Sequence, residues 1–150
     1  MQGLGSFVFD KPVKSVMQRR KSLKASPDTL VSKAAKLMAA KNTGAIMVLE
    51  DDRLVGIFTE RDVVFRVVAR GLDPQATRLA EVMTRAPETI DPDKPFGSAL
   101  VVMQERGFRH LPVVQDGKPI GIVSSRSAMD PELEEFATES NRRKHFGAKR

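Results

Sequence analysis

A hydroxyl and a carboxylate stand three residues apart at Thr59 and Asp62, with Arg61 between them. The pair lies where an expected strand, 54–59, passes into an expected helix, about 60–70. A carboxylate there can accept hydrogen bonds from two neighbouring ligand hydroxyls, while Arg61 and the free amides of the first helical turn favour a phosphate. Thr59 can equally cap the helix, with Asp62 suited to its dipole. These residues alone leave both interpretations open.

The segment that contains this pair occurs twice in the chain. Residues 27–62 align without a gap onto residues 92–127 at a constant offset of 65, and nine of the thirty-six aligned positions are identical. Upstream, residues 15–17 are echoed by residues 81–83 with one residue of slippage. Two copies of one unit therefore nearly fill the chain.

Both copies show the same order of hydrophobic periodicities. Helical spacing follows Pro27-Asp28 and Pro92-Asp93, so we expect each dipeptide to open a helix. Apolar runs separated by the short polar turns 51–52 and 116–117 then predict hairpins. The expected strands are 44–49 and 54–59 in the first copy, and 110–114 and 119–124 in the second. The helix after the first hairpin should stop at Gly71.

A small sheet with helices on one face cannot bury that face alone, so we expect the two copies to pack together about a pseudo-twofold axis. The expected fold class is α+β, with two βαββα repeats, small mixed sheets packed together, and an additional C-terminal helix. The expected divisions are an N-terminal extension (1–12), a first repeat (13–71), a linker (72–79), a second repeat (80–130) and a C-terminal helix with a basic tail (131–150).

The runs Gly56–Asp62 and Arg109–Val114, in a tandem repeat of this size, resemble the cystathionine-β-synthase (CBS) domain family. The likeness spans about residues 13 to 129. The resemblance implies a repeat pair that binds adenosine-containing ligands in one or two clefts and assembles into a disc-shaped homodimer. It also implies a stand-alone regulatory module that passes a signal to an unidentified partner protein and has no catalytic residues.

The family's ribose motif falls on Thr59 and Asp62, and Arg61, or Arg66 one turn later, could pair with a phosphate. In the family, each cleft combines this motif in one repeat with strand residues of the other. The resemblance therefore groups Thr59, Arg61 and Asp62 with Asp91, Arg109 and His110 in one cleft, and Ser124 and Ser127 with Ser26, Gly44 and Ala45 in the other. Because Ser127 replaces the family's aspartate, the second cleft should hold ribose less firmly.

The arginines rank the candidate ligands. They favour AMP, ADP, ATP or NAD over S-adenosylmethionine, whose sulfonium is cationic. An adenine nucleotide is expected as a regulatory ligand, with no cofactor required. Candidate contacts of the homodimer are Phe65, Val68 and Val101.

Composition removes several classes of function. The absence of cysteine excludes disulfides and thiolate sites and fits a cytoplasmic location. The only histidines, His110 and His145, lie on different expected elements, so no metal site is expected. No apolar run is long enough for a membrane span, and no leader is apparent at the start of the chain.

The net charge of +6 comes from the ends of the chain, because residues 26–130 contain fourteen acids and fourteen bases. Nucleic acid is therefore not expected as a partner. Two alternatives stay open: a nucleic-acid-binding accessory protein that uses the basic ends, and a dimerising scaffold with vestigial clefts.

Overall fold

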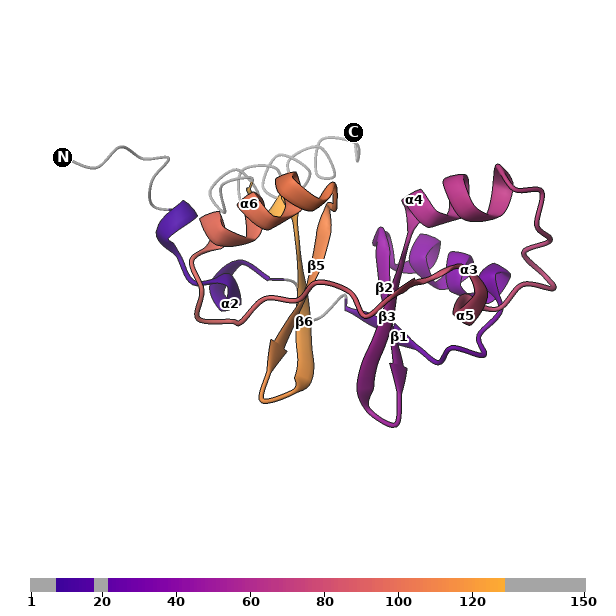
Figure 1. Ribbon diagram of the computed structural model, residues 1–150, viewed down its shortest axis with the longest axis horizontal. Coiled ribbons are helices and arrows are strands. Elements are labelled where there is room, and N and C mark those ends of the chain that lie inside the picture. Colours follow the sequence, from indigo (N-terminus) through magenta and orange to yellow (C-terminus); the bar gives the residue numbers. More distant parts are fainter. Residues whose placement is uncertain (1–7, 18–21, 129–150) are drawn as a thin grey trace, which may run out of the picture.

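The computed structural model describes residues 8–17 and 22–128, and these form two similar halves (Figure 1). Each half is a β-hairpin with helices on its outer side, and the two hairpins lie side by side at the centre. This arrangement confirms the expected α+β fold with small sheets. The helix and basic tail expected at 131–150 lie outside the described residues.

The elements follow one another in the same order in both halves. The first half contains β1 (Leu23–Ala25), α3 (Val31–Lys41), β2 (Ala45–Glu50), β3 (Arg53–Thr59), α4 (Glu60–Asp62) and the π-helix η1 (Val63–Val68). The second half contains α6 (Phe96–Arg106), β5 (His110–Gln115), β6 (Lys118–Ser124) and the 3₁₀-helix η2 (Ser125–Ala128). Two short helices, α2 (Val13–Val16) and α5 (Leu79–Val82), precede the halves, and β4 (Thr84–Arg85) follows α5.

Strand pairing follows the repeat. The first sheet has the order β1-β2-β3-β4, with β1 parallel to β2 and the other pairs antiparallel. In the second half β5 pairs with β6, and Ile90 forms a parallel bridge to Val113 where β1 would pair in the first half. The hairpin turns at Asp51-Asp52 and Asp116-Gly117 have positive φ at both central residues, as the twist of the flanking strands favours.

The expectation that Pro-Asp opens each helix is wrong. α3 begins at Val31 and α6 at Phe96, several residues later. In the first half, the reason is that backbone carbonyls of residues 27–29 accept hydrogen bonds from α5. Pro27 O accepts from Ala80 N at 3.0 Å, and Thr29 O accepts from Leu79 N at 2.9 Å. The dipeptide therefore forms a turn that caps α5.

The two halves exchange their short helices. α5 contributes Leu79 and Val82 to the core of the first half, whereas α2 contributes Val13 to the core of the second. In Figure 1 the indigo α2 accordingly lies beside the orange α6, and α5 lies beside α3. The exchange is reciprocal in the backbone too, since Val31 N donates to Thr77 O and Phe96 N donates to Lys11 O. Each half thus depends on a segment that precedes the other half in sequence.

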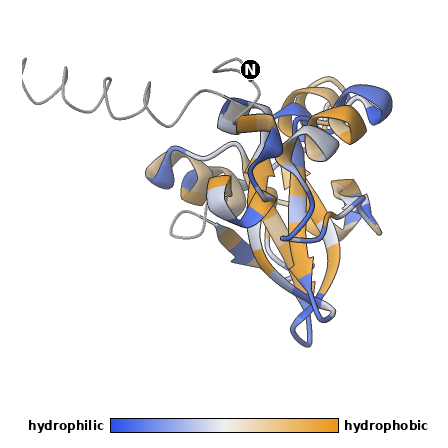
Figure 2. Ribbon diagram, turned by 90° about the vertical axis from the view of Figure 1, so that its left-hand side faces the viewer, coloured by the Kyte–Doolittle hydropathy of each residue, from blue (hydrophilic) through white to orange (hydrophobic). Residues whose placement is uncertain are grey.

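An apolar seam joins the hairpins. Ala45, Met47, Ile57 and Ile122 form a buried cluster contributed by β2, β3 and β6. Figure 2 shows this distribution, with hydrophobic residues along the strands and hydrophilic residues at the hairpin turns. Strands with one face toward helices and the other toward a second hairpin are buried on both sides, which explains the nearly continuous apolar run Ala45–Val48.

Candidate functional site

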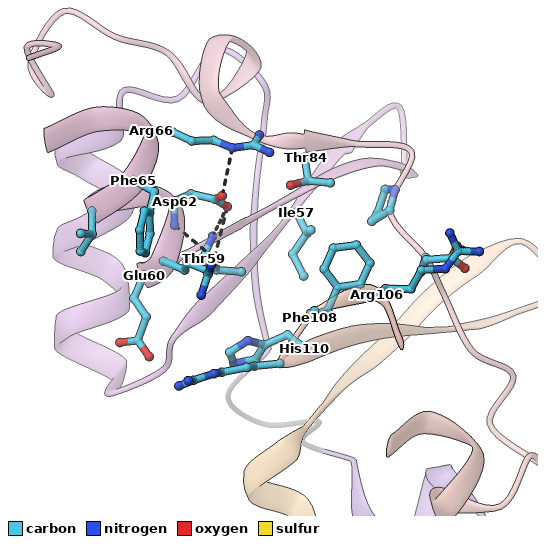
Figure 3. Close-up of a pocket in the computed structure, with 16 residues that line it drawn as sticks. Ile57, Thr59, Glu60, Asp62, Phe65, Arg66, Thr84, Arg106, Phe108 and His110 are labelled. Atoms are coloured by element: carbon cyan, nitrogen blue, oxygen red, sulfur yellow. Dashed lines mark hydrogen bonds and ion pairs between the residues drawn. The ribbon is translucent and has the colours of Figure 1, made fainter. Parts of the chain in front are cut away.

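A cavity of about 800 Å³ lies where the two halves meet, on the helical side of the hairpins (Figure 3). One wall is formed by α4 and η1 of the first half. The facing wall consists of the residues around the end of α6 and the start of β5, including Phe108 and His110. A third side comes from the segment after β4, with Pro87 and Glu88. A ligand in this cavity would therefore contact both halves.

Thr59 and Asp62 form a reciprocal cap at the first helical turn of this wall. Thr59 N donates to Asp62 Oδ2 at 2.9 Å, and Asp62 N donates to Thr59 Oγ1 at 3.3 Å. The Thr59 hydroxyl also donates to Asp62 Oδ2 at 3.2 Å. The helix-cap interpretation is therefore confirmed, and it fixes the carboxylate in the wall of the cavity, where Oδ1 stays free of this cap.

The Asp62 carboxylate is largely removed from solvent, with the residue only 8% exposed. Burial raises the pKa of Asp62 above its ordinary value, while the Thr59 N–H and the charge of Arg66 act in the opposite direction. Arg66 Nε lies 3.5 Å from Asp62 Oδ1, as the dashed line in Figure 3 shows. The site thus contains a carboxylate that is largely shielded from water and whose oxygens can accept hydrogen bonds.

Four arginines line the cavity against three acids. Two of them are paired, Arg66 with Asp62 and Arg106 with Glu88 at 3.4 Å. In the described part of the chain Arg61 and Arg109 form no ion pair, and the Arg61 guanidinium lies 4.5 Å from the centre of the Phe65 ring. These two side chains can offer positive charge to an anionic ligand group.

His110 begins β5 and meets the first half at Gly44 and Glu60. A Cβ atom on Gly44 would lie 2.9 Å from Glu60 Oε1 and 3.5 Å from His110 Cε1, so a larger residue here would require the exposed Glu60 side chain to shift. Burial lowers the pKa of His110 below its ordinary value. Glu60 opposes this change, while Arg109 and Arg126 reinforce it. The surroundings of His110 therefore favour its neutral form.

Five of the six residues that were grouped in the first cleft line this one cavity: Thr59, Arg61, Asp62, Arg109 and His110. Asp91 is not among the lining residues. Its carboxylate instead accepts a hydrogen bond from Asp93 N at 2.8 Å in the exposed turn before α6. The ligand-binding role of all six stays a prediction.

The residues grouped in the second cleft are found in several surroundings. Ser124 and Ser127 are buried, and Ser124 N donates to Ser127 Oγ at 3.3 Å, where Asp62 serves in the first half. Ser26 Oγ lies 3.3 Å from Thr29 Oγ1. Ala45 packs in the seam between the hairpins, whereas Gly44 lies beside His110 of the first cavity. Their roles toward a ligand also stay predictions.

Sequence reasoning missed much of the lining. The additional residues are Ile57, Glu60, Val64, Thr84, Pro87, Glu88, Arg106, Gly107 and Phe108, while Phe65 was named only as a dimer contact. Most lie in the segments 84–88 and 106–108, away from the strand-to-helix junction that carries Thr59 and Asp62. A signal was present in the run Arg106–His110, where charged and aromatic residues interrupt the apolar pattern before β5.

The two halves also match a known family model in order and extent. The CBS domain model matches residues 13–69 and again residues 79–131. The chain belongs to the CBS domain family. The repeat found in the sequence is therefore a tandem pair of CBS repeats, and the cavity lies between them.

Relatives of this CBS pair include much longer proteins. The chain is similar to the meiotically up-regulated gene 70 protein of Schizosaccharomyces pombe, with 39% identity over 120 residues. The matched region covers 73% of this chain and 16% of that protein. The chain thus spans a small part of the length of this relative.

Solved structures share the fold. A crystal structure of an uncharacterised conserved protein from Pyrococcus horikoshii has a TM-score of 0.74 and 32% identity, and the match covers 79% of this chain and 89% of that one. A CBS domain pair crystallised with 5′-methylthioadenosine and S-adenosyl-L-methionine has a TM-score of 0.71 and 25% identity, with 78% and 95% covered.

Metal-binding clusters and membrane-spanning helices are both absent from the described ranges. Within 8–17 and 22–128, no three acidic or histidine side chains gather closely enough to hold a metal ion. Over the same ranges, no helix has the length and apolar character needed to cross a membrane.

The depressed pKa of His110 predicts a pH-dependent stability. In the unfolded chain this histidine titrates near its ordinary value of about 6.5. Because the folded-state pKa is lower, the contribution of His110 to stability is present above that value and is lost as the pH falls through the folded-state pKa. We expect the His110→Gln variant to lose less stability than the wild type between about pH 7 and 5. Urea unfolding across this range measures the difference, and parallel curves for the two proteins would contradict the prediction.

Proposed function

We propose that this CBS pair binds a phosphorylated adenine nucleotide (AMP, ADP, ATP or NAD) in the cavity between its repeats and acts as the sensing part of a regulatory protein. The observation that carries the proposal is that one cavity contains the Thr59–Asp62 cap of one repeat together with Arg109 and His110 of the other. A ligand that bridges these groups would change how the repeats contact each other, which a partner protein can detect.

The adenosine part of the proposal is supported by the carboxylate of Asp62. A buried, ionised carboxylate can accept hydrogen bonds from both hydroxyls of a ribose. The related CBS pair that was crystallised with 5′-methylthioadenosine and S-adenosyl-L-methionine shares 25% of its residues with this chain, and both of those ligands contain adenosine. The cavity also offers Ile57, Val64 and Phe108 as apolar surface for a base.

The phosphate part is supported by Arg61 and Arg109. Neither side chain is neutralised by an acid in the described residues, and they come from opposite walls. A sulfonium group would face these guanidinium groups without gaining an attractive partner from them. His110 would add a positive charge if phosphate raised its pKa.

The role is one of binding, without catalysis. The repeats form a regulatory module in this proposal, and the regulated protein is unidentified. A cytoplasmic location stays a prediction from the absence of cysteine.

Calorimetric titration of the purified chain with AMP, ADP, ATP, NAD and S-adenosylmethionine tests the proposed ligand. We expect at least one of the four phosphorylated nucleotides to bind, and S-adenosylmethionine to bind more weakly because its cation meets Arg61 and Arg109. Tight binding of S-adenosylmethionine alone would show that the arginines have another role. If no adenosine ligand bound, the proposed function would be wrong and the scaffold alternative would be favoured.

The two clefts should differ in affinity. A charge-assisted hydrogen bond to Asp62 contributes roughly 1.5 to 3 kcal/mol, whereas a hydroxyl such as that of Ser127 contributes about 1 kcal/mol. The difference corresponds to about a tenfold gap in dissociation constant. We therefore expect Asp62→Ala to abolish most high-affinity nucleotide binding in calorimetry, while Ser127→Ala changes it little. The reverse ranking would place the main site in the second cleft.

A homodimer is also proposed, because apolar side chains remain exposed on the outer helices. Val68 is 69% exposed, Phe65 57% and Val101 54%. Val64 and Leu72 extend the exposed apolar surface beside η1. A second copy of the chain would remove this surface from water.

The exposed valine of η1 separates dimerisation from ligand binding, since Val68 does not line the cavity. We expect Val68→Glu to shift the chain toward monomer in light scattering at tens of micromolar, because two added charges would face each other or lie buried in a symmetric interface. Gln115→Glu, at an exposed hairpin position, adds the same single charge and is the matched control, which should leave the mass unchanged. A wild type that is already monomeric would contradict the proposed dimer.

A further inference from the structure

Arg66 lines the cavity and contacts two separate segments of the chain. Its Nε lies 3.5 Å from Asp62 Oδ1 on the α4 side. Its Nη1 donates to the backbone carbonyl of Val82 at 3.2 Å and to that of Met83 at 3.0 Å. These carbonyls lie at the end of α5, sixteen and seventeen residues further along the chain. One guanidinium group therefore connects the site carboxylate to the end of α5, at the start of the second repeat.

The segment held by Arg66 continues directly into the wall of the cavity. Thr84 follows Met83, and Pro87 and Glu88 line the third side. On its other face, this segment lies so close to β3 that a Cβ on Gly56 would be 2.5 Å from Met83 Sδ and 3.0 Å from Thr84 O. Residues 82–84 are therefore held by close contact with β3 on one side and by Arg66 on the other.

These contacts leave Arg66 poorly placed to bind a phosphate. Both its Nε and its Nη1 are directed at protein oxygens, and its charge is shared with Asp62. Arg61 and Arg109 have no comparable acceptors in the described residues. The expectation that Arg66 could pair with a ligand phosphate stays a prediction, and these contacts indicate an additional role.

We propose that Arg66 is a positioning residue that sets the relative placement of the Asp62 carboxylate and the 82–88 wall. This placement lets the two contact the ribose and the base of one ligand at the same time. A planar guanidinium can donate along two directions at once, which an ammonium cannot do with the same geometry. The effect on ligand affinity rests on the proposed function. The effect on Asp62 itself does not depend on any ligand.

Three variants separate this role from ordinary stabilisation. Arg66→Met removes both the charge and the bridge, whereas Arg66→Lys keeps a charge but not the forked geometry. Arg85→Met is the matched control, because Arg85 Nη2 donates to the carbonyl of Ala80 at 2.9 Å in the same linker but does not contact Asp62. The measurements are the dissociation constant of AMP across pH, the thermal midpoint, and the titration of the Asp62 carboxyl carbon by NMR.

Arg66→Met should weaken AMP binding roughly five- to tenfold. It should also raise the pKa of Asp62, because the charge of Arg66 lowers that pKa in the wild type. Acidification should then abolish AMP binding at a higher pH than in the wild type. Arg66→Lys should restore the titration of Asp62 but leave the affinity reduced. Arg85→Met should change neither property, even if its thermal midpoint falls.

Wild-type affinity in Arg66→Met, full restoration of affinity in Arg66→Lys, or an equal loss in Arg85→Met would each overturn the proposal. If Arg66→Met does not fold, the lysine variant still decides between charge and bridge. A wild type that binds no nucleotide would refute the proposed function, and the ligand-free titration of Asp62 would then decide the role of Arg66 by itself.

Discussion

A buried carboxylate needs partners, and much of the first repeat serves to supply them to Asp62. The Thr59 backbone and hydroxyl satisfy one oxygen, and Arg66 approaches the other. Arg66 in turn needs the carbonyls of Val82 and Met83, which are available because α5 packs into the core of the first repeat. The geometry of the candidate site therefore depends on a chain of contacts that reaches from the helix cap to the linker.

The proposed ligand binding and the stability of the fold favour different protonation states of this carboxylate. Because burial raises the folded-state pKa of Asp62, its favourable contribution to stability is present at low pH and is lost as the pH rises through that value. At neutral pH the ionised form is a cost to the fold. In the second repeat the equivalent cap uses the neutral hydroxyl of Ser127, which avoids this cost and also provides a weaker acceptor. The two repeats thus differ at the same helix start, with an ionisable carboxylate in the first and a neutral hydroxyl in the second.

Sequence alone predicted the local elements well and the contacts between them poorly. The hairpins fell close to their expected positions because period-two patterns and positive-φ turn residues are local signals. The helix starts were placed too early, because the acceptors of Pro27 and Thr29 are filled by α5, about fifty residues away. Two other contacts were missed because they also join residues far apart in the sequence. They are the hydrogen bonds of Arg66 to the carbonyls of Val82 and Met83, and the proximity of Glu60 to His110. Thr59 and Arg109 were grouped across the repeats because the family resemblance, rather than any local pattern, supplied long-range information, and both line the cavity.

The exchange of short helices also bears on the origin of the pair. A single repeat with its own short helix would lack the partner segment that fills its core and caps its turn, so an ancestral one-repeat chain could complete its fold only by trading these segments with a second copy. Joining the two copies in one chain replaces that association with an intramolecular contact at high effective concentration. Once the copies were joined, each could diverge separately. The carboxylate of Asp62 and the hydroxyl of Ser127 are one such difference between the two copies.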